Sequence, residues 1–476
     1  MTFTSAQFII FVIISYLIFK STKFKWQALL AFSVFYYASY SIKAFSYLAL
    51  TILTTYFSAL YLEKNKNHWL LFLCLLINFS SLFFVKFTDF TLFENLIPLG
   101  ISFYIFISTA YLIDVYRKKY PANKNLLKYT LFVSYFPQMV QGPINRYDSL
   151  GPQLFDPKPN SRDFSYGLML MAYGYFKKLV IADRASVLTA QIFSNPDEFS
   201  GLFVFIAIIF YSIQIYGDFS GGIDIARGVS YLFGIKLDLN FKRPFFATSL
   251  TDFWRRWHIS LGSWMRDYVF YPMSLSKVFA HINKKSRKVL GRKYGKFLTL
   301  TISTFVVYFI IGIWHGAGLN FMAFGIFNGS LISLGLIFED FFKKIKSSLN
   351  ISKDSKSFKV FQILRTSLLV FFARYFTRSK DLETALFMLK KTFADRIFRY
   401  GEFGLERIDY IVLFISVLIL FIISFKEERG EDVKEEILSL SPISQGILIF
   451  MVLAFILYFG IFQRSFTGAE FIYRNY

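Results

Sequence analysis

Long apolar runs recur along the whole chain, and they constrain its fold more than any other feature of the sequence. A helix needs about 20 mostly apolar residues to cross the hydrocarbon core of a bilayer. Candidate segments lie at residues 6–19, 26–40, 43–62, 69–85, 97–115, 129–142, 166–182, 200–217, 299–315, 320–338, 359–377, 410–425 and 446–463. Several are short, and short segments tilt or re-enter where protein surrounds their backbone. The sequence therefore predicts an all-α polytopic membrane protein with about 11–13 transmembrane or re-entrant helices.

The composition supports this class of protein. Of 476 residues, 55% are hydrophobic and 63 are Phe, which is more large apolar surface than one aqueous core can bury. No internal repeat or low-complexity linker divides the chain, so we expect a single integral-membrane domain over residues 1–476. The first apolar run has no basic segment before it and no small-residue cleavage site behind it, so we interpret it as a retained first span.

Basic residues exceed acidic ones, with 53 Lys and Arg against 31 Asp and Glu and a net charge of +22. Nucleic-acid binding gives such an excess too, but these charges lie in short loops between apolar runs, which favours a role in membrane orientation. Ten lie in the first, third and fifth loops (Lys20, Lys23, Lys25, Lys64, Lys66, Arg117, Lys118, Lys119, Lys124, Lys128) and two in the second and fourth (Lys43, Lys86). The positive-inside rule assigns the first set to the cytoplasm, so we expect the N-terminus outside.

His315 is the leading candidate for chemistry. It ends the apolar run and is followed by Gly316, Ala317 and Gly318, so we expect a helix to break beside an imidazole at membrane depth. Ionisable groups at that depth are costly and usually functional. The structural alternative is a core histidine bonded to a backbone carbonyl. A neutral imidazole there accepts the proton of an attacking hydroxyl, which is the task of the base in acyl transfer.

A second group of candidates begins at Trp254, in a stretch too polar to span a bilayer and too apolar to float free. On one helix Trp254, Trp257 and His258 would share a face, with Arg255 well around from it. An interfacial helix with aromatic and arginine anchors explains this pattern structurally. Arginine and tryptophan at the mouth of a cavity also suit an acyl donor that carries phosphates and a purine. Both interpretations stay open at this point.

The segment 216–224 (YGDFSGGID) holds three glycines and two aspartates, Asp218 and Asp224. Its glycines lack the spacing of nucleotide-binding loops. We expect a broken helix here, forming a re-entrant turn or a cavity wall. No histidine pair or dense carboxylate set accompanies the aspartates, and Cys74 is the one cysteine, so neither a metal site nor an intrachain disulfide is expected.

Five motifs, in this order, resemble the bacterial branch of the membrane-bound O-acyltransferase family, whose members acetylate alginate or peptidoglycan or transfer D-alanine to teichoic acids. They are PLGISFY at 98–104 with YLIDVYR at 111–117, FPQMVQGPI at 136–144, the Asp218–Asp224 cluster, DFWRRWHISL at 252–261 with Trp264, Arg266, Asp267 and Tyr268 in step, and WHGA at 314–317. The resemblance extends over most of the chain. Each motif alone is weak, whereas five in sequence are specific.

The resemblance implies site roles. His315 corresponds to the catalytic histidine of the family's WHG motif. The substrate-binding candidates are Trp254, Arg255, Arg256, Trp257, His258, Asp267, Trp314, Asn328 and Asp218. Relatives often carry a second histidine where this chain has Asn328, which forms hydrogen bonds but does not exchange protons as imidazole does. The ending FIYRNY at 471–476 is similar to that of this branch, where a terminal tyrosine is proposed to carry the acyl group; this points to Tyr473, although aromatic ends are also common interface anchors.

The resemblance further implies an activity and partners. We expect helices around a central funnel in the bacterial cytoplasmic (inner) membrane, with no bound cofactor and with acetyl-CoA or another acyl thioester as the donor substrate. A secreted or membrane-anchored SGNH-type esterase or acetyltransferase would complete transfer to a polysaccharide acceptor of the alginate or peptidoglycan type. No nucleic-acid partner is expected.

Two other functions stay open. Within the family, the alternative is D-alanyl transfer to teichoic acid from a carrier-protein thioester. From another class, a lipid or acyl-carrier transporter also uses broken helices and polar residues at the bilayer midplane. The hydropathy pattern shows no inverted repeat, which argues against the transporter.

Overall fold

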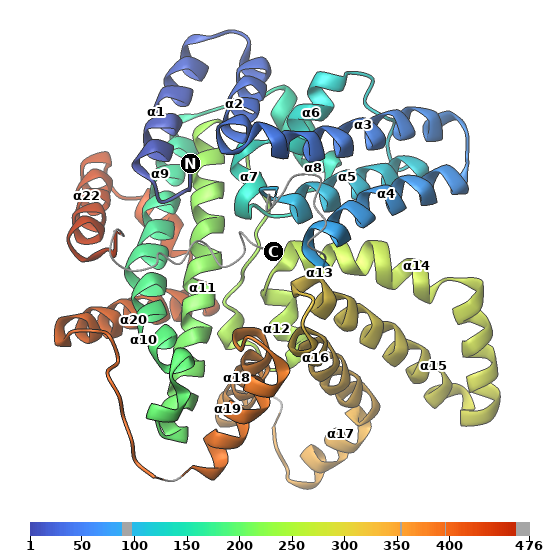
Figure 1. Ribbon diagram of the computed structural model, residues 1–476, viewed down its shortest axis with the longest axis vertical. Helices are drawn as coiled ribbons and strands as arrows, with labels where there is room; N and C mark the ends of the chain where they lie inside the picture. Colours follow the sequence, from blue (N-terminus) through green and yellow to red (C-terminus); the bar gives the residue numbers. More distant parts are fainter. Residues whose placement is uncertain (88–97, 353–354, 396, 463–476) are drawn as a thin grey trace. The chain divides into compact units, whose positions relative to one another are not determined.

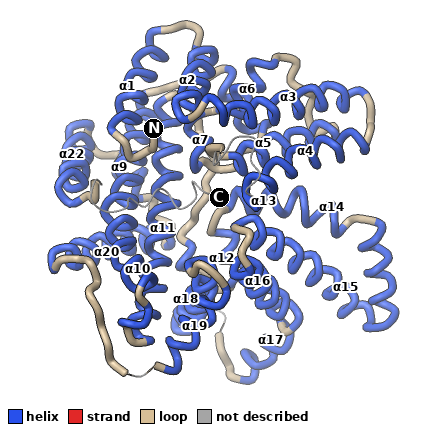
Figure 2. The backbone as a smooth tube through the Cα atoms, viewed as in Figure 1, coloured by secondary structure: helices blue, strands red, loops and turns tan. Residues whose placement is uncertain are grey.

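The computed structural model describes residues 1–87, 98–352, 355–395 and 397–462. Within these ranges every regular element is helical, and the single exception to helix and loop is an isolated antiparallel bridge between Phe241 and Trp257. Figure 2 shows this pattern, with helices joined by short loops. The predicted all-α class is confirmed.

The chain forms two compact units, each built from separated stretches of sequence. The first unit comprises Met1–Arg184, Gln214–Leu239 and Glu406–Tyr476, and the second comprises Ala185–Ile213 and Asn240–Leu405. One integral-membrane domain over the whole chain stays a prediction.

The first unit contains α1 (Ala6–Ser21), α2 (Lys25–Tyr40), α3 (Ile42–Lys64), α4 (His68–Phe87), α5 (Ile101–Tyr116), α6 (Leu126–Ser134), α7 (Phe136–Gln141), α8 (Tyr147–Phe155), α9 (Ser161–Tyr175), the π-helix η1 (Phe176–Ala182), α20 (Arg407–Glu428), α21 (Val433–Leu438) and α22 (Pro442–Phe459). The predicted segment 129–142 is divided at Tyr135 into α6 and α7. α3 packs against α4 and α5 (Figure 1).

The second unit contains η2 (Pro196–Glu198), η3 (Pro244–Phe246), α12 (Leu250–Arg256), α13 (Ile259–Met265), the π-helix η4 (Arg266–Phe270), α14 (Tyr271–Ser274), α15 (Lys277–His315), α16 (Leu319–Ile337), α17 (Glu339–Ser348), α18 (Lys356–Arg378) and α19 (Leu382–Ala394). Two helices, α10 (Asp183–Ser194) and α11 (Gly201–Leu232), contribute residues to both units. Gly291, with φ of 78°, interrupts α15 within its basic stretch, and the apolar part of the helix begins at Phe297.

Seven of the described helices are long and apolar enough to cross a bilayer: α3, α4, α11, the part of α15 at Phe297–His315, α16, α20 and α22. α1 and α5 are shorter apolar helices. Length and composition of these helices confirm a polytopic membrane protein. The remaining predicted segments form shorter helices, except 359–377, which lies in the 23-residue α18.

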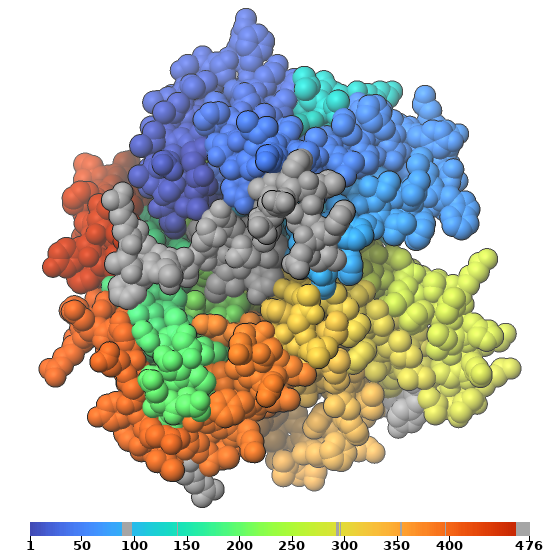
Figure 3. Space-filling model, viewed as in Figure 1, coloured from blue at the N-terminus to red at the C-terminus, as the bar shows by residue number. Residues whose placement is uncertain are grey.

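Large apolar side chains on the outside of these helices explain why the chain needs lipid as its solvent. α4 buries Cys74, Asn78, Leu82 and Val85 but exposes side chains such as Trp69, which is 69% exposed. Part of the α3–α4 surface is visible in mid-blue in Figure 3. A helix that is apolar on its exposed face as well as its buried face is typical of a membrane span.

The prediction of a broken helix at residues 216–224 is wrong, because α11 runs unbroken through this segment. Its glycines serve close packing: a Cβ on Gly221 would lie 2.8 Å from the carbonyl oxygen of Gly174, and one on Gly228 would lie 2.6 Å from that of Gly167. Small residues let two membrane helices approach backbone to backbone. The glycines therefore join α11 to α9 rather than ending it (Figure 1).

Candidate functional site

His315 is the last residue of α15, and α16 begins at Leu319, so the predicted helix break beside the imidazole is confirmed. The two helices meet closely. A Cβ on Gly312 would lie 2.5 Å from the Phe321 carbonyl oxygen, and one on Gly325 would lie 2.6 Å from the Tyr308 carbonyl oxygen. This backbone contact fixes the end of α15 against α16 (Figure 1).

Aromatic rings surround the half-buried His315. Its ring centroid lies 4.8 Å from that of Trp314 and 5.6 Å from that of Phe324, which meets it edge to face at 87°. Trp314 in turn lies 6.0 Å from the ring of His258. The indole of Trp314 is therefore next to both imidazoles. These aromatic neighbours carry no charge that would compete with a substrate for a hydrogen bond to an imidazole.

Asn328 and Trp254 extend this cluster on the Phe324 side. Trp254 Nε1 donates to Asn328 Oδ1 at 3.3 Å, and Asn328 Nδ2 donates to the Phe324 carbonyl oxygen at 2.9 Å. The Trp254 ring also lies 6.1 Å from that of Phe324. The structure thus brings together four predicted site residues from three helices: Trp254 (α12), Trp314 and His315 (α15), and Asn328 (α16).

The single helix predicted through Trp254, Trp257 and His258 is wrong. α12 ends at Arg256, Trp257 is extended, and His258 adopts a left-handed conformation with φ of 48° and ψ of 52°. The three side chains therefore do not share one helix face. Left-handed backbone is uncommon for a residue other than glycine, and it persists where the surrounding structure holds it.

Asn240 holds the turn at His258, and sequence reasoning missed it. Asn240 Oδ1 accepts hydrogen bonds from Ser260 N and Ser260 Oγ, both at 2.9 Å, and it lies 3.3 Å from His258 Nδ1. The Asn240 carbonyl oxygen accepts from Ile259 N at 3.0 Å. His258 is 3% exposed, and this burial lowers the pKa of its imidazole to about 3. His258 is therefore neutral at physiological pH.

Trp257 lies in the packed interior of the second unit. It is 2% exposed, stacks on Phe253 at a centroid distance of 5.6 Å and meets Phe241 edge to face at 5.0 Å. The guanidinium of the buried Arg374 lies 4.8 Å from its ring centroid, which is a cation–π contact that no sequence pattern predicts. Trp257 thereby anchors α12 to α18.

The charged candidates of this stretch differ in exposure. Arg255 is exposed, whereas Arg256 Nε pairs with Asp252 Oδ1 at 3.0 Å. Asp267 accepts two bonds from the neighbouring Arg266, at 2.8 and 3.4 Å. These pairs are partly exposed, and each contributes little to stability on its own.

Asp218 lies in the first unit, in a buried ionic cluster that sequence reasoning did not identify. Lys178 Nζ lies 2.5 Å from Asp218 Oδ1 and 2.8 Å from Asp183 Oδ1. Lys177 Nζ lies 2.7 Å from Asp224 Oδ2. Both lysines belong to the π-helix η1, a geometry frequent at functional sites. Two lysines inside the predicted span 166–182 were the available signal, because charges in such a segment need partners.

Tyr473 lies outside the described residues, so its proposed role as an acyl carrier stays a prediction.

These features define an all-α integral membrane protein whose leading candidate, His315, lies at the end of an apolar helix. The model of the membrane-bound O-acyltransferase family matches residues 11–351. The chain therefore belongs to this family, and it is a multi-span membrane acyltransferase.

The chain is similar to curated relatives with three kinds of name. It is 32% identical over 403 residues to a "Peptidoglycan O-acetyltransferase" of Helicobacter pylori, which covers 75% of this chain and 72% of the relative. It is 31% identical over 350 residues to a "Probable alginate O-acetylase AlgI" of Pseudomonas syringae, covering 72% and 62%. It is 30% identical over 261 residues to a "Teichoic acid D-alanyltransferase" of Bacillus subtilis, covering 53% and 62%. The chain thus spans less than two thirds of the alginate and teichoic acid relatives.

Proposed function

We propose that this protein passes an acetyl group from a cytoplasmic thioester donor across the membrane for O-acetylation of a cell-envelope or extracellular polysaccharide. The observation that carries this proposal is the position of His315. It ends a membrane-length helix at a break, half-buried among Trp314 and Phe324, with Asn328 and Trp254 bonded to each other beside Phe324.

His315 acts in this proposal as the general base, or it orients the acceptor hydroxyl. Its imidazole takes the hydroxyl proton while the oxygen attacks the thioester carbonyl, and the thiolate leaves with a proton. Positioning of both reactants in a site with little water supplies part of the barrier lowering. Asn328 fixes the Trp254 indole by its hydrogen bond, so Trp254 can line the donor side without turning away.

The donor is acetyl-CoA, with no bound cofactor, and its phosphates meet the exposed Arg255 at the cytoplasmic mouth of a funnel. The N-terminus faces outward in the cytoplasmic (inner) membrane, in keeping with the basic loops. A secreted or membrane-anchored SGNH-type partner finishes transfer to the polysaccharide. The peptidoglycan and alginate relatives support an acceptor of one of these two types.

D-alanyl transfer is the second candidate, supported by the teichoic acid relative. The acetyltransferase proposal is preferred because the peptidoglycan relative covers 75% of this chain and the D-alanyl relative covers 53%.

Purified protein in vesicles tests the proposal, with labelled acetyl-CoA or a labelled D-alanyl carrier thioester added from the side of Arg255. We expect label from acetyl-CoA to reach an acceptor hydroxyl, and a His315→Ala variant to abolish this transfer. Transfer from the carrier thioester alone would replace the proposal with its alternative. Movement of an intact lipid or carrier in the His315→Ala variant would identify a transporter instead.

A further inference from the structure

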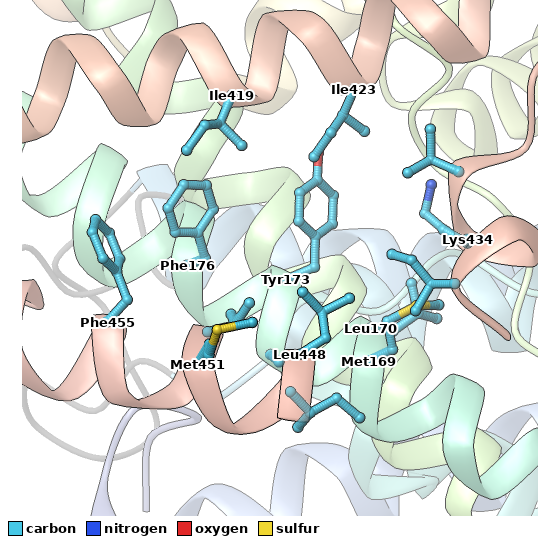
Figure 4. Close-up of a pocket in the computed structure, with 15 residues that line it drawn as sticks. Met169, Leu170, Tyr173, Phe176, Ile419, Ile423, Lys434, Leu448, Met451 and Phe455 are labelled. Carbon is cyan, nitrogen blue, oxygen red and sulfur yellow. The ribbon is translucent and has the colours of Figure 1, made fainter. Parts of the chain in front are cut away.

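The first unit contains a cavity of about 350 Å³ between α9, η1, α20, α21 and α22. Figure 4 shows Ile419 and Ile423 of α20 on one side, Leu448 and Met451 of α22 on the other, and Tyr173 and Phe176 between them. The lining side chains are apolar except for Tyr173 and Lys434. We call this cavity the C-terminal groove.

The C-terminal groove exists because α20 and α22 each pack on η1. Ile456 is the one buried residue of α22, so this helix presents nearly all of its apolar surface outward. The main-chain nitrogen of Ile461 donates to the Leu179 carbonyl oxygen at 3.1 Å, which ties the end of α22 to η1. The flanking helices are therefore held in place while the apolar space beside them is left for another molecule.

The size of the groove limits what that molecule can be. Its volume falls in the range of about 300–1,000 Å³ that small-molecule sites occupy. In a membrane protein, a slender and wholly apolar occupant is a hydrocarbon chain.

The polar end of the groove indicates which kind of headgroup a lipid bound there would carry. Lys434 lies at the end opposite Phe455 (Figure 4), forms an ion pair with Glu427, and its ammonium lies 5.8 Å from the Tyr173 ring centroid. The segment 426–436 around it carries three basic residues (Lys426, Arg429, Lys434) and six acidic ones (Glu427, Glu428, Glu431, Asp432, Glu435, Glu436), and Arg162 of α9 pairs with Glu435, so acidic residues still outnumber basic ones. This excess of acid repels a purely anionic headgroup and attracts an ammonium.

We propose that the C-terminal groove binds one acyl chain of a membrane phospholipid whose headgroup carries an ammonium, as phosphatidylethanolamine does. The chain lies along Leu448, Met451 and Phe176, and the ammonium meets the acidic side chains of segment 426–436. The lipid fills the apolar space beside these side chains, adds contacts to them, and joins α20 to α22. This site is independent of the His315 cluster and of the proposed reaction.

Photolabelling tests this proposal on the purified full-length protein in vesicles. The probe is phosphatidylethanolamine with a diazirine on its acyl chain. We expect labelled peptides from α9–η1 and α22, and we expect unlabelled phosphatidylethanolamine to compete away the label while phosphatidylglycerol does not. Equal competition by both lipids would overturn the headgroup assignment. Label confined to other helices would overturn the site.

Two substitutions on α22 distinguish the effect of filling the groove from the effect of adding a tryptophan elsewhere on the helix. Leu448→Trp fills the groove, whereas Leu457→Trp places the same ring at a position that is 72% exposed and outside the lining. We expect Leu448→Trp to lower labelling of α9–η1 by roughly fivefold or more, because the added ring excludes the chain, and Leu457→Trp to leave it unchanged. Equal labelling in both variants would reject the proposal. Competition by unlabelled lipid in the unsubstituted protein also tests binding in the groove. The proposal therefore stays testable if a variant fails to fold.

Discussion

The Lys177–Lys178 cluster of the first unit and the histidine cluster of the second unit surround their polar groups in opposite ways. In the first unit, Lys177 and Lys178 are buried and each contacts a carboxylate within 2.7 Å. In the second unit, the two imidazoles have aromatic rings and an amide as the neighbours described above, and His258 is held neutral by burial. Paired charges fix a structure, because separating them is costly. The His315 ring lies among aromatic side chains at the end of a helix, so the second unit is the one suited to the proposed chemistry.

Loss of the His315 imidazole tests the chemical side of this contrast and has the largest expected effect. In cells, His315→Ala should lower O-acetyl content of the envelope by about 100-fold or more, since general bases contribute about 10²–10⁴. The acetate that mild alkali releases from the envelope measures this O-acetyl content, in strains with matched levels of the protein. His281→Ala is the control, because His281 is exposed on the same helix. Unchanged acetyl content in His315→Ala would remove His315 from the mechanism.

Breaking the ionic cluster tests whether the paired charges of the first unit stabilise the fold. Lys178→Ala leaves Asp218 and Asp183 without this cation and should destabilise the protein by about 3–5 kcal/mol, the cost typical of a broken buried pair. Thermal unfolding in detergent measures the change in Tm. The control is Lys343→Ala, whose pair with Glu339 is exposed and should contribute about 1 kcal/mol or less. Equal Tm shifts in both variants would contradict a special role for the cluster.

The buried His258 predicts a pH effect of intermediate size. Its folded pKa of about 3 lies below the ordinary value of 6.5, so below pH 6.5 the unfolded chain takes up a proton that the folded chain does not. Stability is therefore undiminished above pH 6.5 and falls between pH 6.5 and about 3, by at most about 1.4 kcal/mol per unit. Unfolding of the protein and of His258→Gln across this window measures the difference. Identical pH slopes would mean that His258 is protonated in the fold.

The Trp254–Asn328 bond predicts the smallest effect. Asn328→Ala removes the acceptor of Trp254 Nε1 and should cost about 1 kcal/mol of stability. If Trp254 lines the donor site, KM for the thioester rises while kcat changes little. Asn65→Ala is the matched control, because Asn65 also donates to a carbonyl oxygen four residues earlier but is exposed. A fall in kcat alone would place Asn328 in the chemical step.

The helix break at His315 could be predicted because its signal is local: glycines follow the imidazole directly at residues 316 and 318. The turn at His258 could not, since its cause is Asn240, a residue 18 positions earlier that no local pattern connects to it. The residues near Asp218 were misread for the opposite reason. Glycine often ends helices, but Gly221 has a backbone neighbour, Gly174, that only the fold brings close.

The seven membrane-length helices could be predicted from the length of the apolar runs alone. The ion pairs of the buried lysines could not. Lys177 and Lys178 lie in a run that otherwise has the pattern of a span. Besides Asp183, their partners are Asp218, 40 residues after Lys178, and Asp224, 47 residues after Lys177. Hydropathy records the cost of such charges but not which residues offset it. Four of the predicted site residues, Trp254, Trp314, His315 and Asn328, contact one another or share Phe324 as a neighbour, while their roles stay predictions.

The glycine contact between α15 and α16 has a consequence for inherited variation in the gene. A single methyl group at residue 312 or 325 would push the two helices apart and carry Phe324 and Asn328 away from the imidazole. Alleles that alter these two glycines would then behave in a genetic screen like alleles of His315 itself, although neither glycine has a side chain to offer a substrate.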